Sequence, residues 1–385
     1  MIKILDKHDC CGCAACVQIC PKKCISFDED ERGFRYPLVN NEMCIDCGMC
    51  ENVCPVLNQS EFRKPLKTYA AQNLNHEVRL ISSSGGIFSS LAETIILEGG
   101  VVFGARFNEN WEVVHSYTET KEGLEPFRGS KYVQSCIGDS YQRVKDFLKN
   151  GRKVLFTGTP CQISGLKRYL NKDYAELLTV EVACHGVPSP KIWREYLECK
   201  LKKYPGMIVS NVSFRDKTSG WSKFSVKINY SATDEITQFD QDVFMKGFIK
   251  NLYLRPSCYS CNARKGKSGA DICIADYWGV GTIHPDIDDD KGTSLVIIYS
   301  EKGEHYYESI IKEVRSVISD YDKAVVYNPC IEKSVVLPKA SAGFWSQYFQ
   351  KKENLVLLIS NKIKPSLSDR VKKVLKKVIK QLILR

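Results

Sequence analysis

Eight cysteines near the N-terminus follow a spacing that suits iron–sulfur chemistry. Each run reads C-x-x-C-x-x-C-x-x-x-C followed by proline, once over residues 10–21 and again over residues 44–55. In two-cluster bacterial ferredoxins such runs bind two 4Fe-4S clusters, and the fourth cysteine of each run ligates the other run's cluster. The predicted ligands of the first cluster, cluster one, are Cys10, Cys13, Cys16 and Cys54. The predicted ligands of the second, cluster two, are Cys44, Cys47, Cys50 and Cys20.

Other uses of these cysteines explain the spacing less well. A zinc ribbon needs only two C-x-x-C pairs and leaves the rest of each run unexplained. The C-x-x-x-C-x-x-C spacing of radical-SAM enzymes is absent from the chain. Cys11 and Cys24 stand outside the pattern, and we interpret both as packing residues, although Cys11 also competes with Cys10 as a ligand. The pattern therefore predicts electron transfer.

Two glycine-containing loops are candidates for binding a phosphorylated cofactor. Residues 82–86 (SSSGG) directly precede an expected helix, where backbone N–H groups suit a pyrophosphate. A capped helix with a serine-rich turn explains the same residues without a ligand. Residues 128–135 (RGSKYVQS) offer cations and hydroxyl groups that suit phosphate or the edge of a flavin, and a solvated turn explains them equally well.

Four further cysteines fall where turns are expected, at Cys161, Cys184, Cys258 and Cys261. The first two follow buried strands, and the other two form a C-x-x-C pair. Together they supply the four thiolates that a third cubane needs. A structural zinc ion and four unrelated buried thiols are the alternatives. The remaining cysteines are predicted to pack singly, and they are Cys136, Cys199, Cys273 and Cys330.

The elements that must position these residues alternate between strands and helices. A hairpin is expected over residues 25–28 and 34–39. Strands are expected over residues 68–72, 101–107, 153–157, 177–183, 209–214, 224–230, 272–275 and 295–300. Helices are expected over residues 87–97, 141–149, 162–170, 191–203 and 344–359. The predicted fold is an α+β ferredoxin-like 2x4Fe-4S module, followed by a mixed α/β body and a C-terminal amphipathic helix.

Five parts follow from these expectations. Residues 1–57 form the ferredoxin module, and the polar residues 58–66 form a linker. The body is expected in an N-terminal part, residues 67–150, and a C-terminal part with the candidate third cluster, residues 151–343. Residues 344–385 are expected to form a helical basic tail.

The formal net charge of +10 belongs mostly to the end of the chain. Residues 361–385 contain nine Lys or Arg residues and one acidic residue, so the rest is close to neutral, and no nucleic-acid partner is expected. Apolar residues from Val371 onward recur at helical spacing between lysines, which predicts an amphipathic helix suited to an anionic membrane surface. A helix docked on the body, with solvated lysines, is the alternative.

The compartment follows from cysteine use and from the lack of apolar segments. The chain has 18 cysteines and no apolar h-region at its start. Nor does any apolar run approach the roughly 18 residues of a membrane span. Clustered cysteines in a reducing compartment are more often metal ligands than disulfides. The expected location is the cytoplasm, with peripheral contact at the inner face of the cell membrane through the tail.

Several short motifs, in order, make this chain resemble the beta subunits of coenzyme F420-reducing hydrogenases and dehydrogenases, whose relatives include 7-hydroxymethyl chlorophyll a reductase. Besides the ferredoxin runs, these are residues 82–88 (SSSGGIF), 129–134 (GSKYVQ), 158–162 (GTPCQ), 184–189 (CHGVPS), 258–261 (CYSC) and 271–279 (DICIADYWG). The resemblance implies a flavoprotein body in which FAD exchanges electrons with nearby clusters. It supports a third cluster, a ferredoxin-like electron donor or acceptor, and a small-molecule substrate or a deazaflavin.

The resemblance also implies roles for particular residues. Ser83, Ser84, Gly85 and Gly86 would bind FAD phosphates. Ser130, Lys131 and Tyr132 would contact the flavin or its ribityl chain. His185 and Asp276 are candidate catalytic residues, with turn stabilisation and loop ordering as their alternatives. The expected function is an iron–sulfur flavoprotein oxidoreductase. A non-catalytic electron-relay subunit and a membrane-surface assembly factor with structural clusters are the alternative functions.

Overall fold

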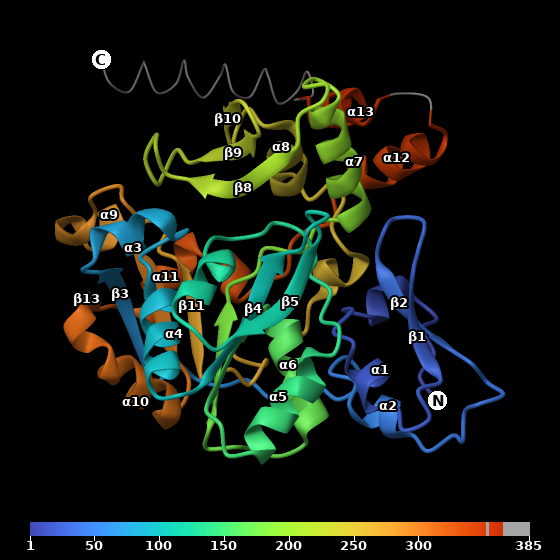
Figure 1. Ribbon diagram of the computed structural model, residues 1–385, viewed down its shortest axis with the longest axis horizontal. Coiled ribbons are helices and arrows are strands. Elements are labelled where there is room, and N and C mark those ends of the chain that lie inside the picture. The colour runs from blue at the N-terminus through green and yellow to red at the C-terminus, as the bar shows by residue number, and fades with distance from the viewer. Residues whose placement is uncertain (352–353, 365–385) are drawn as a thin grey trace.

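The computed structural model describes residues 1–351 and 354–364, so the predicted amphipathic helix beyond residue 370 lies outside the described residues. A ferredoxin-type module, a large mixed sheet and a small second sheet make up the described chain (Figure 1). None of the described helices is long and apolar enough to cross a membrane.

The N-terminal module contains a β-hairpin and two short helices. Strands β1 (Ile25–Glu29) and β2 (Arg35–Val39) pair antiparallel, as the sequence predicts. Helices α1 (Ala15–Ile19) and α2 (Met49–Asn52) lie within the two cysteine runs. The module lies beside α5 (Ser140–Lys149) and α6 (Pro160–Leu170), where Ala14, Ala15 and Val53 join the same apolar core as Ile163 and Leu166.

The large sheet has eight strands in the order β13-β3-β12-β11-β7-β6-β4-β5. Its centre is four parallel strands: β11 (Ile272–Asp276), β7 (Leu177–Val182), β6 (Val154–Gly158) and β4 (Val101–Phe107). The flanking antiparallel strands are β5 (Val113–Thr118), β12 (Ser294–Ile298), β3 (Lys67–Asn73) and β13 (Val314–Ile318). Parallel strands place their C-terminal ends at one edge, where the connecting loops meet.

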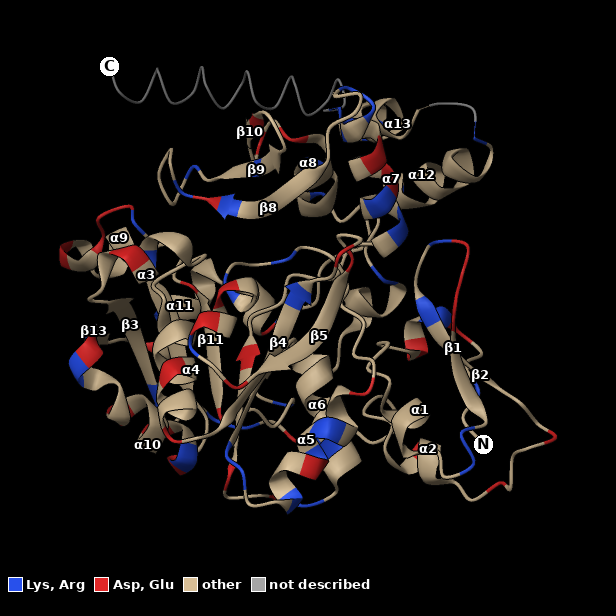
Figure 2. Cartoon of the chain, viewed as in Figure 1, with Lys and Arg blue, Asp and Glu red and all other residues tan. Residues whose placement is uncertain are grey.

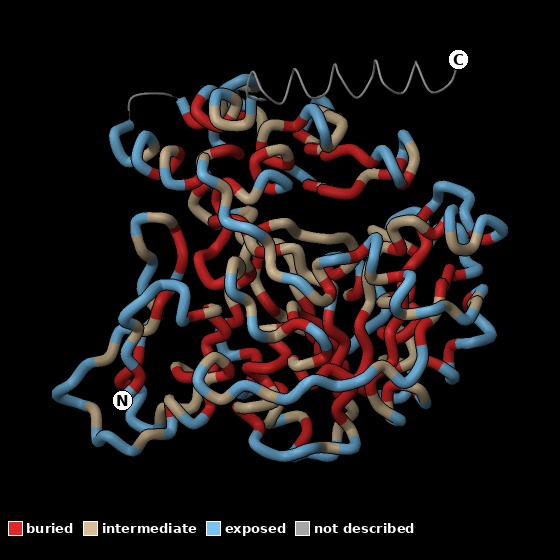
Figure 3. The backbone as a smooth tube through the Cα atoms, turned by 180° about the vertical axis from the view of Figure 1, so that it is seen from behind, coloured by how far each residue is buried: buried red, intermediate tan, exposed pale blue. Residues whose placement is uncertain are grey.

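Helices cover both faces of this sheet. Helices α4 (Ile87–Leu97) and α10 (Glu301–Ser309) pack on one face, where Leu91 and Tyr307 are buried, and α5 and α6 cover the other. The remaining helices of this part are α3 (His76–Ile81), α9 (Val280–Ile283) and α11 (Tyr321–Tyr327). The most continuous buried backbone runs through the strands of the sheet (Figure 3). This is the mixed α/β body that the alternation of elements predicts.

A second core forms around the small sheet β10-β9-β8. Its strands are β8 (Val209–Asp216), β9 (Ser225–Tyr230) and β10 (Asp234–Gln238), and its helices are α7 (Pro190–Leu201), α8 (Val243–Ile249), α12 (Lys339–Phe349) and α13 (Leu355–Ile363). The single helix expected over residues 344–359 is wrong, because the chain forms two helices there. Trp345 and Leu358 of the two helices are both buried in this core, which a single straight helix does not allow.

Candidate functional site

Both cysteine runs bend their backbone in the same way. The second residue after the first cysteine is left-handed in each run, with φ of 73° at Gly12 and 52° at Asp46. The fourth is left-handed too, with φ of 62° at Ala14 and 73° at Gly48. Alternating left-handed and ordinary residues turn successive N–H groups into a concave surface that suits iron–sulfur clusters. The repeated backbone geometry therefore matches the repeated spacing.

The predicted ligands of cluster two surround one hollow in the module. Cys20, Cys44, Cys47 and Cys50 all line it, together with Cys24. The Sγ atoms of Cys20 and Cys24 are 3.3 Å apart, which places this extra thiol beside the set rather than in a separate core. Cys47 is exposed and Ile45 beside it is 58 % exposed, so this site lies at the surface.

The predicted ligands of cluster one are more deeply placed and also come together. Cys10, Cys13 and Cys16 are buried, and Cys54 is half-buried. Burial, with the neighbouring thiols of Cys10 and Cys54, raises the pKa of Cys16. The pKa of Cys54 is also raised, mainly by burial and to a lesser extent by the nearby thiol of Cys10. Thiolates so close repel one another unless positive charge lies between them, and the irons of a cluster supply that charge.

Neither set is arranged like the site of a single ion. Among the described residues, no three His, Cys, Asp or Glu side chains converge on one metal position. A cubane takes its thiolates at separate corners, so its ligands surround a volume rather than a point.

The third set of cysteines gathers at the C-terminal edge of the parallel strands. β6 and β7 are parallel neighbours, and Cys161 and Cys184 follow them. Cys258 and Cys261 come from the short helix η3 (Pro256–Ser260) and the residue after it. Burial raises the pKa of Cys184, and the thiols of Cys258, Cys161 and Cys261 all contribute. Burial likewise raises the pKa of Cys258 to about 12, with contributions from Cys261 and Cys161.

Two buried arginines flank this third set. Arg264 donates from Nη1 to the carbonyl oxygen of Cys184 at 2.7 Å and from Nη2 to that of His185 at 3.1 Å. Arg255 is fully buried and counters the raised pKa of both Cys161 and Cys258. Neither arginine has a carboxylate within ion-pair distance in the described part of the chain. Buried cations need an anionic partner, and four thiolates around a cubane provide one.

Cys11 lies between cluster one and the third set. Its thiol lies near those of Cys13 and Cys161, and the Cys13 thiol is the largest cause of its raised pKa. Contact with Cys11 is in turn the largest cause of the raised pKa of Cys161. From the sequence, Cys11 was interpreted as a packing residue or as a competitor of Cys10 for ligating cluster one. Its position between the two sets follows from the packing of the module on the body, which the sequence does not show.

The two glycine-containing loops lie against each other, between α3 and α4 and after β5. The backbone N–H of Ser130 donates to Oγ of Ser83 at 2.6 Å. Gly85 contacts β3 and the start of β12, where an added Cβ would lie 2.3 Å from the carbonyl oxygen of Ala71. Gly86, with φ of 86°, caps the N-terminus of α4. The structure thus brings together residues that are 47 positions apart in the chain.

Some of the predicted cofactor residues are engaged by the protein itself. Ser84 Oγ donates to the carbonyl oxygen of Thr293 at 2.8 Å. Lys131 donates to the carbonyl oxygens of Pro126 and Arg128, and burial lowers its pKa to about 7. The Tyr132 ring packs against Phe214 and Phe248.

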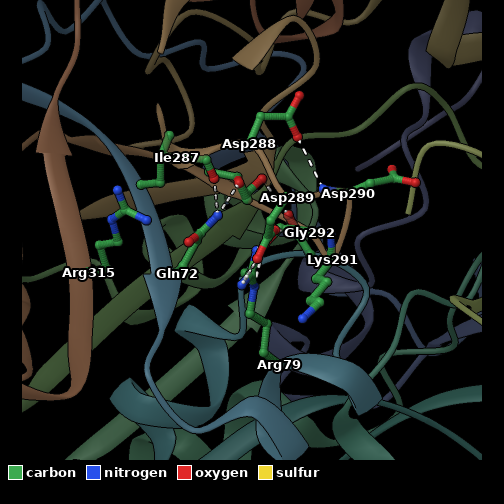
Figure 4. Close-up of polar contacts among 12 residues, drawn as sticks. Gln72, Arg79, Ile287, Asp288, Asp289, Asp290, Lys291, Gly292 and Arg315 are labelled. Atoms are coloured by element: carbon green, nitrogen blue, oxygen red, sulfur yellow. Dashed lines mark hydrogen bonds and ion pairs between the residues drawn. The ribbon is translucent and has the colours of Figure 1, made fainter. Parts of the chain in front are cut away.

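More buried cations surround these loops than the sequence indicates. Lys217 donates to the carbonyl oxygens of Arg79 and Ser84 at 2.6 and 3.0 Å, and burial lowers its pKa to about 7. Arg79 pairs with Asp289 in the loop of residues 287–292, which Figure 4 shows folded over it. Arg215 donates to the carbonyl oxygen of Ser83 at 3.2 Å, and its Nε has no hydrogen-bond partner among the described residues.

Two lysines at these loops have no acidic partner. Arg79 pairs with Asp289 and Arg215 pairs with Asp276, whereas Lys131 and Lys217, whose pKa values burial lowers to about 7, have no carboxylate within ion-pair distance in the described part of the chain. A bound anion would favour the charged form of both lysines. A diphosphate fits both this charge and the glycine-lined approach of the backbone.

The two candidate catalytic residues have protein partners. His185 lies 2.6 Å from Asn251 Oδ1 through Nε2, and burial lowers its pKa. Asp276 accepts hydrogen bonds from Arg215 at 2.9 Å and from the Trp221 indole at 3.0 Å. Within the described ranges, no hydrogen bond or ion pair joins His185 and Asp276. Their catalytic roles stay predictions.

These features define an iron–sulfur protein of the oxidoreductase type. Residues 9–58 match the family model of the 4Fe-4S dicluster domain, and residues 151–324 match the model for the C terminus of the coenzyme F420 hydrogenase/dehydrogenase beta subunit. Residues 151–324 are thus similar to the coenzyme F420 hydrogenase/dehydrogenase beta subunit family, and residues 9–58 match a 4Fe-4S dicluster domain. The predicted resemblance and the predicted dicluster domain are therefore confirmed.

Similar proteins include redox enzymes and their subunits. The chain is 25% identical over 317 residues to the coenzyme F420-dependent sulfite reductase of Methanocaldococcus jannaschii, covering 80% of this chain but only 47% of that protein. It is 25% identical over 328 residues to a subunit of the F(420)H(2) dehydrogenase of Methanosarcina mazei, covering 80% and 84% respectively. A solved structure of the F420-reducing [NiFe] hydrogenase complex from Methanosarcina barkeri matches with a TM-score of 0.47 and 16% identity, covering 82% of this chain and 93% of that chain.

Proposed function

We propose that this chain is an iron–sulfur flavoprotein oxidoreductase that passes electrons between a ferredoxin-like partner and a small organic substrate or deazaflavin. The carriers would be cluster two, cluster one, a third 4Fe-4S cluster and FAD, in that order. The observation that carries the proposal is the junction at Cys11, whose thiol lies close enough to those of Cys13 and Cys161 that they shift one another's pKa.

The order of the carriers follows from exposure. Cys47 of cluster two is exposed, whereas Cys10, Cys13 and Cys16 of cluster one are buried against the body. A partner protein therefore reaches cluster two first. The third set follows cluster one through Cys11, which makes the path continuous from the surface of the module into the body.

The body connects the third set to the proposed flavin site through aromatic side chains. His185 follows Cys184 directly, and its ring packs against that of Phe248, with the two ring centroids 5.2 Å apart. The Phe248 ring packs in turn against that of Tyr132, with the two ring centroids 4.9 Å apart. These contacts support placing the redox-active end of the cofactor near Tyr132 and its diphosphate near the glycines and buried cations.

Each group of residues has a defined task in this proposal. The loop of residues 82–86, with Arg215 and Lys217, would hold the diphosphate, and Ser130 and Tyr132 would position the flavin. Bound FAD would exchange single electrons with a cluster and electron pairs with an organic substrate. Asp276, held by Arg215 and Trp221, keeps the arginine oriented toward Ser83.

Iron and flavin content after anaerobic purification tests the proposal. We expect about twelve irons and one FAD per chain, because each 4Fe-4S cluster carries four irons. The variant Cys184→Ala should lose about four irons and keep about eight. Cys199→Ala is the matched control, since Cys199 lies in α7 away from the three cysteine sets, and it should keep all of the iron.

The contrary outcomes separate the alternatives. About eight irons with FAD would remove the third cluster and keep the enzyme. About eight irons without flavin, even after FAD is added, would leave an electron-relay subunit. Clusters that dithionite cannot reduce in the folded protein would favour an assembly factor with structural clusters.

A further inference from the structure

Arg255 is a residue of the body whose side chain is buried in the dicluster domain. It immediately precedes η3, and its backbone N–H donates to the carbonyl oxygen of Val187 at 2.9 Å. Its guanidinium donates from Nε to the carbonyl oxygen of Cys10 at 2.7 Å and from Nη2 to that of Arg35 at 3.0 Å. Tyr36 covers it, with the ring centroid 4.3 Å from Cζ.

The module is shaped to admit this side chain. A Cβ at Gly12 would lie 2.9 Å from the Arg255 guanidinium and 2.6 Å from Gln134 Nε2. Gln134 Oε1 accepts from Arg255 Nη1 at 3.0 Å, and Gln134 Nε2 donates to the carbonyl oxygen of Cys11 at 3.3 Å. Arg255 and Gln134 are thus held together against the first cysteine run.

One donor of Arg255 reaches a predicted cluster ligand. Nη2 lies 3.4 Å from Sγ of Cys10. Hydrogen bonds to cluster sulfurs, and positive charge nearby, stabilise the reduced cluster and raise its reduction potential. The effect is strong here because Arg255 is 0 % exposed and has no carboxylate partner in the described part of the chain. None of its hydrogen bonds reaches a predicted ligand of cluster two.

We propose that Arg255 is a positioning residue that makes cluster one easier to reduce than cluster two. The difference draws electrons from the exposed cluster to the buried one, next to the body. This inference rests on the ligand assignment of the dicluster domain, and it needs neither the third cluster nor FAD. Its failure is therefore distinguishable from failure of the flavoenzyme proposal.

The test is a redox titration of the full chain, purified anaerobically and followed by electron paramagnetic resonance of the reduced clusters. In the unsubstituted protein the two dicluster clusters should reduce in two steps. In Arg255→Met the midpoint of the first step should move to a more negative potential, toward the second, and the second should stay in place. Arg255→Lys keeps the charge but loses the fork of donors, so its shift should have the same direction and be smaller.

Two further variants keep the test decisive. Gln134→Met removes the acceptor for Nη1 without removing the arginine, and it should shift the same step slightly. Arg143→Met removes an exposed arginine that pairs with Asp139, and it should change neither step. Unchanged midpoints in Arg255→Met or Arg255→Lys at full iron content, or equal shifts of both steps, would overturn the proposal. Loss of iron from Arg255→Met, Arg255→Lys and Gln134→Met alike would show that Arg255 has only a structural role. That result would overturn the proposal as well.

Discussion

Glu181 illustrates how burial alone gives a single residue an unusual property. It lies in the central strand β7, opposite Cys273 of β11, and is 3 % exposed. Its Oε2 has no hydrogen-bond partner among the described residues. Burial raises the pKa of Glu181 to about 7, and contacts with Ser268 and Cys273 only partly oppose the rise. This carboxyl group is therefore protonated in the folded protein over a range where it is ionised in the unfolded chain.

Replacing Glu181 by glutamine should change the pH dependence of stability. The pKa of Glu181 is higher in the folded state than in the unfolded chain. Its contribution to the free energy of unfolding is therefore fully present below about pH 4.5 and is lost as the pH rises through about 7. Glu181→Gln keeps the neutral shape, so it should equal the natural protein near pH 4.5 and unfold at a higher temperature at pH 8. The gain at pH 8 should be on the order of 2–3 kcal/mol.

Thermal unfolding followed by circular dichroism under anaerobic conditions, from pH 5 to pH 8, checks this expectation. Glu308→Gln, at an exposed position of α10, is the matched control and should follow the natural protein at every pH. A difference between Glu181→Gln and the natural protein that is the same at pH 5 and pH 8 would contradict the proposed ionisation.

At the scale of elements, the sequence predicts what is local. The eight dicluster cysteines lie within two short runs, so their spacing carries the whole signal. The helix expected over residues 87–97 matches α4, because its apolar residues recur on one face. The edge strand β13 and the strand β10 were not predicted, since five residues of mixed polarity give little periodic signal.

Topology supplies what the sequence pattern left open. The sequence groups Cys161 and Cys258 in a candidate third set but leaves unrelated buried thiols as an alternative, and the two come close because β6 and β7 are parallel neighbours and η3 returns to their edge. The separation of β8, β9 and β10 into their own sheet has no local signature either. Arg255 was missed because nothing in its neighbourhood in the sequence distinguishes it from the 55 Lys and Arg residues of the chain.

The loop between α3 and α4 offers a test of how an element shapes the proposed cofactor site. Gly85 has ordinary backbone angles, but a Cβ there would lie 2.3 Å from the carbonyl oxygen of Ala71 and 2.7 Å from the backbone nitrogen of Ser294. Gly85→Ala should therefore push the loop away from β3 and β12. We expect a loss of about 1–3 kcal/mol of stability and a lower FAD content per chain, measured by unfolding and by flavin absorbance.

Gly343→Ala is the control for this substitution. Gly343 lies in α12, where the nearest atom to an added Cβ is the flexible end of Lys362 at 3.3 Å. It should keep its FAD and gain about 0.5–1 kcal/mol, as alanine does over glycine in a helix. If Gly85→Ala loses stability but binds as much FAD as the natural protein, the loop is not the diphosphate site.

At the scale of the whole molecule, charge is distributed unevenly along the chain. Lys and Arg are interspersed with Asp and Glu over the described body (Figure 2), whereas residues 361–385 hold nine basic residues and one acidic residue. Such a segment attracts anionic lipid by about 1 kcal/mol per basic residue near the surface, and salt weakens the attraction within a Debye length. We propose that the end of the chain brings the redox body to an anionic membrane surface.

Sedimentation with lipid vesicles tests this placement. The full chain should bind vesicles that contain anionic lipid, bind less as salt increases, and not bind neutral vesicles. Replacing Lys372, Lys373, Lys376 and Lys377 together by glutamine keeps the length and the apolar residues but removes four charges, and it should abolish most of the binding. Iron and flavin content should not change, because these residues lie outside the three cysteine sets and the glycine-containing loops. Equal binding by the substituted chain would show that the basic residues do not direct the protein to lipid, and would leave the docked, solvated helix as the interpretation of this segment.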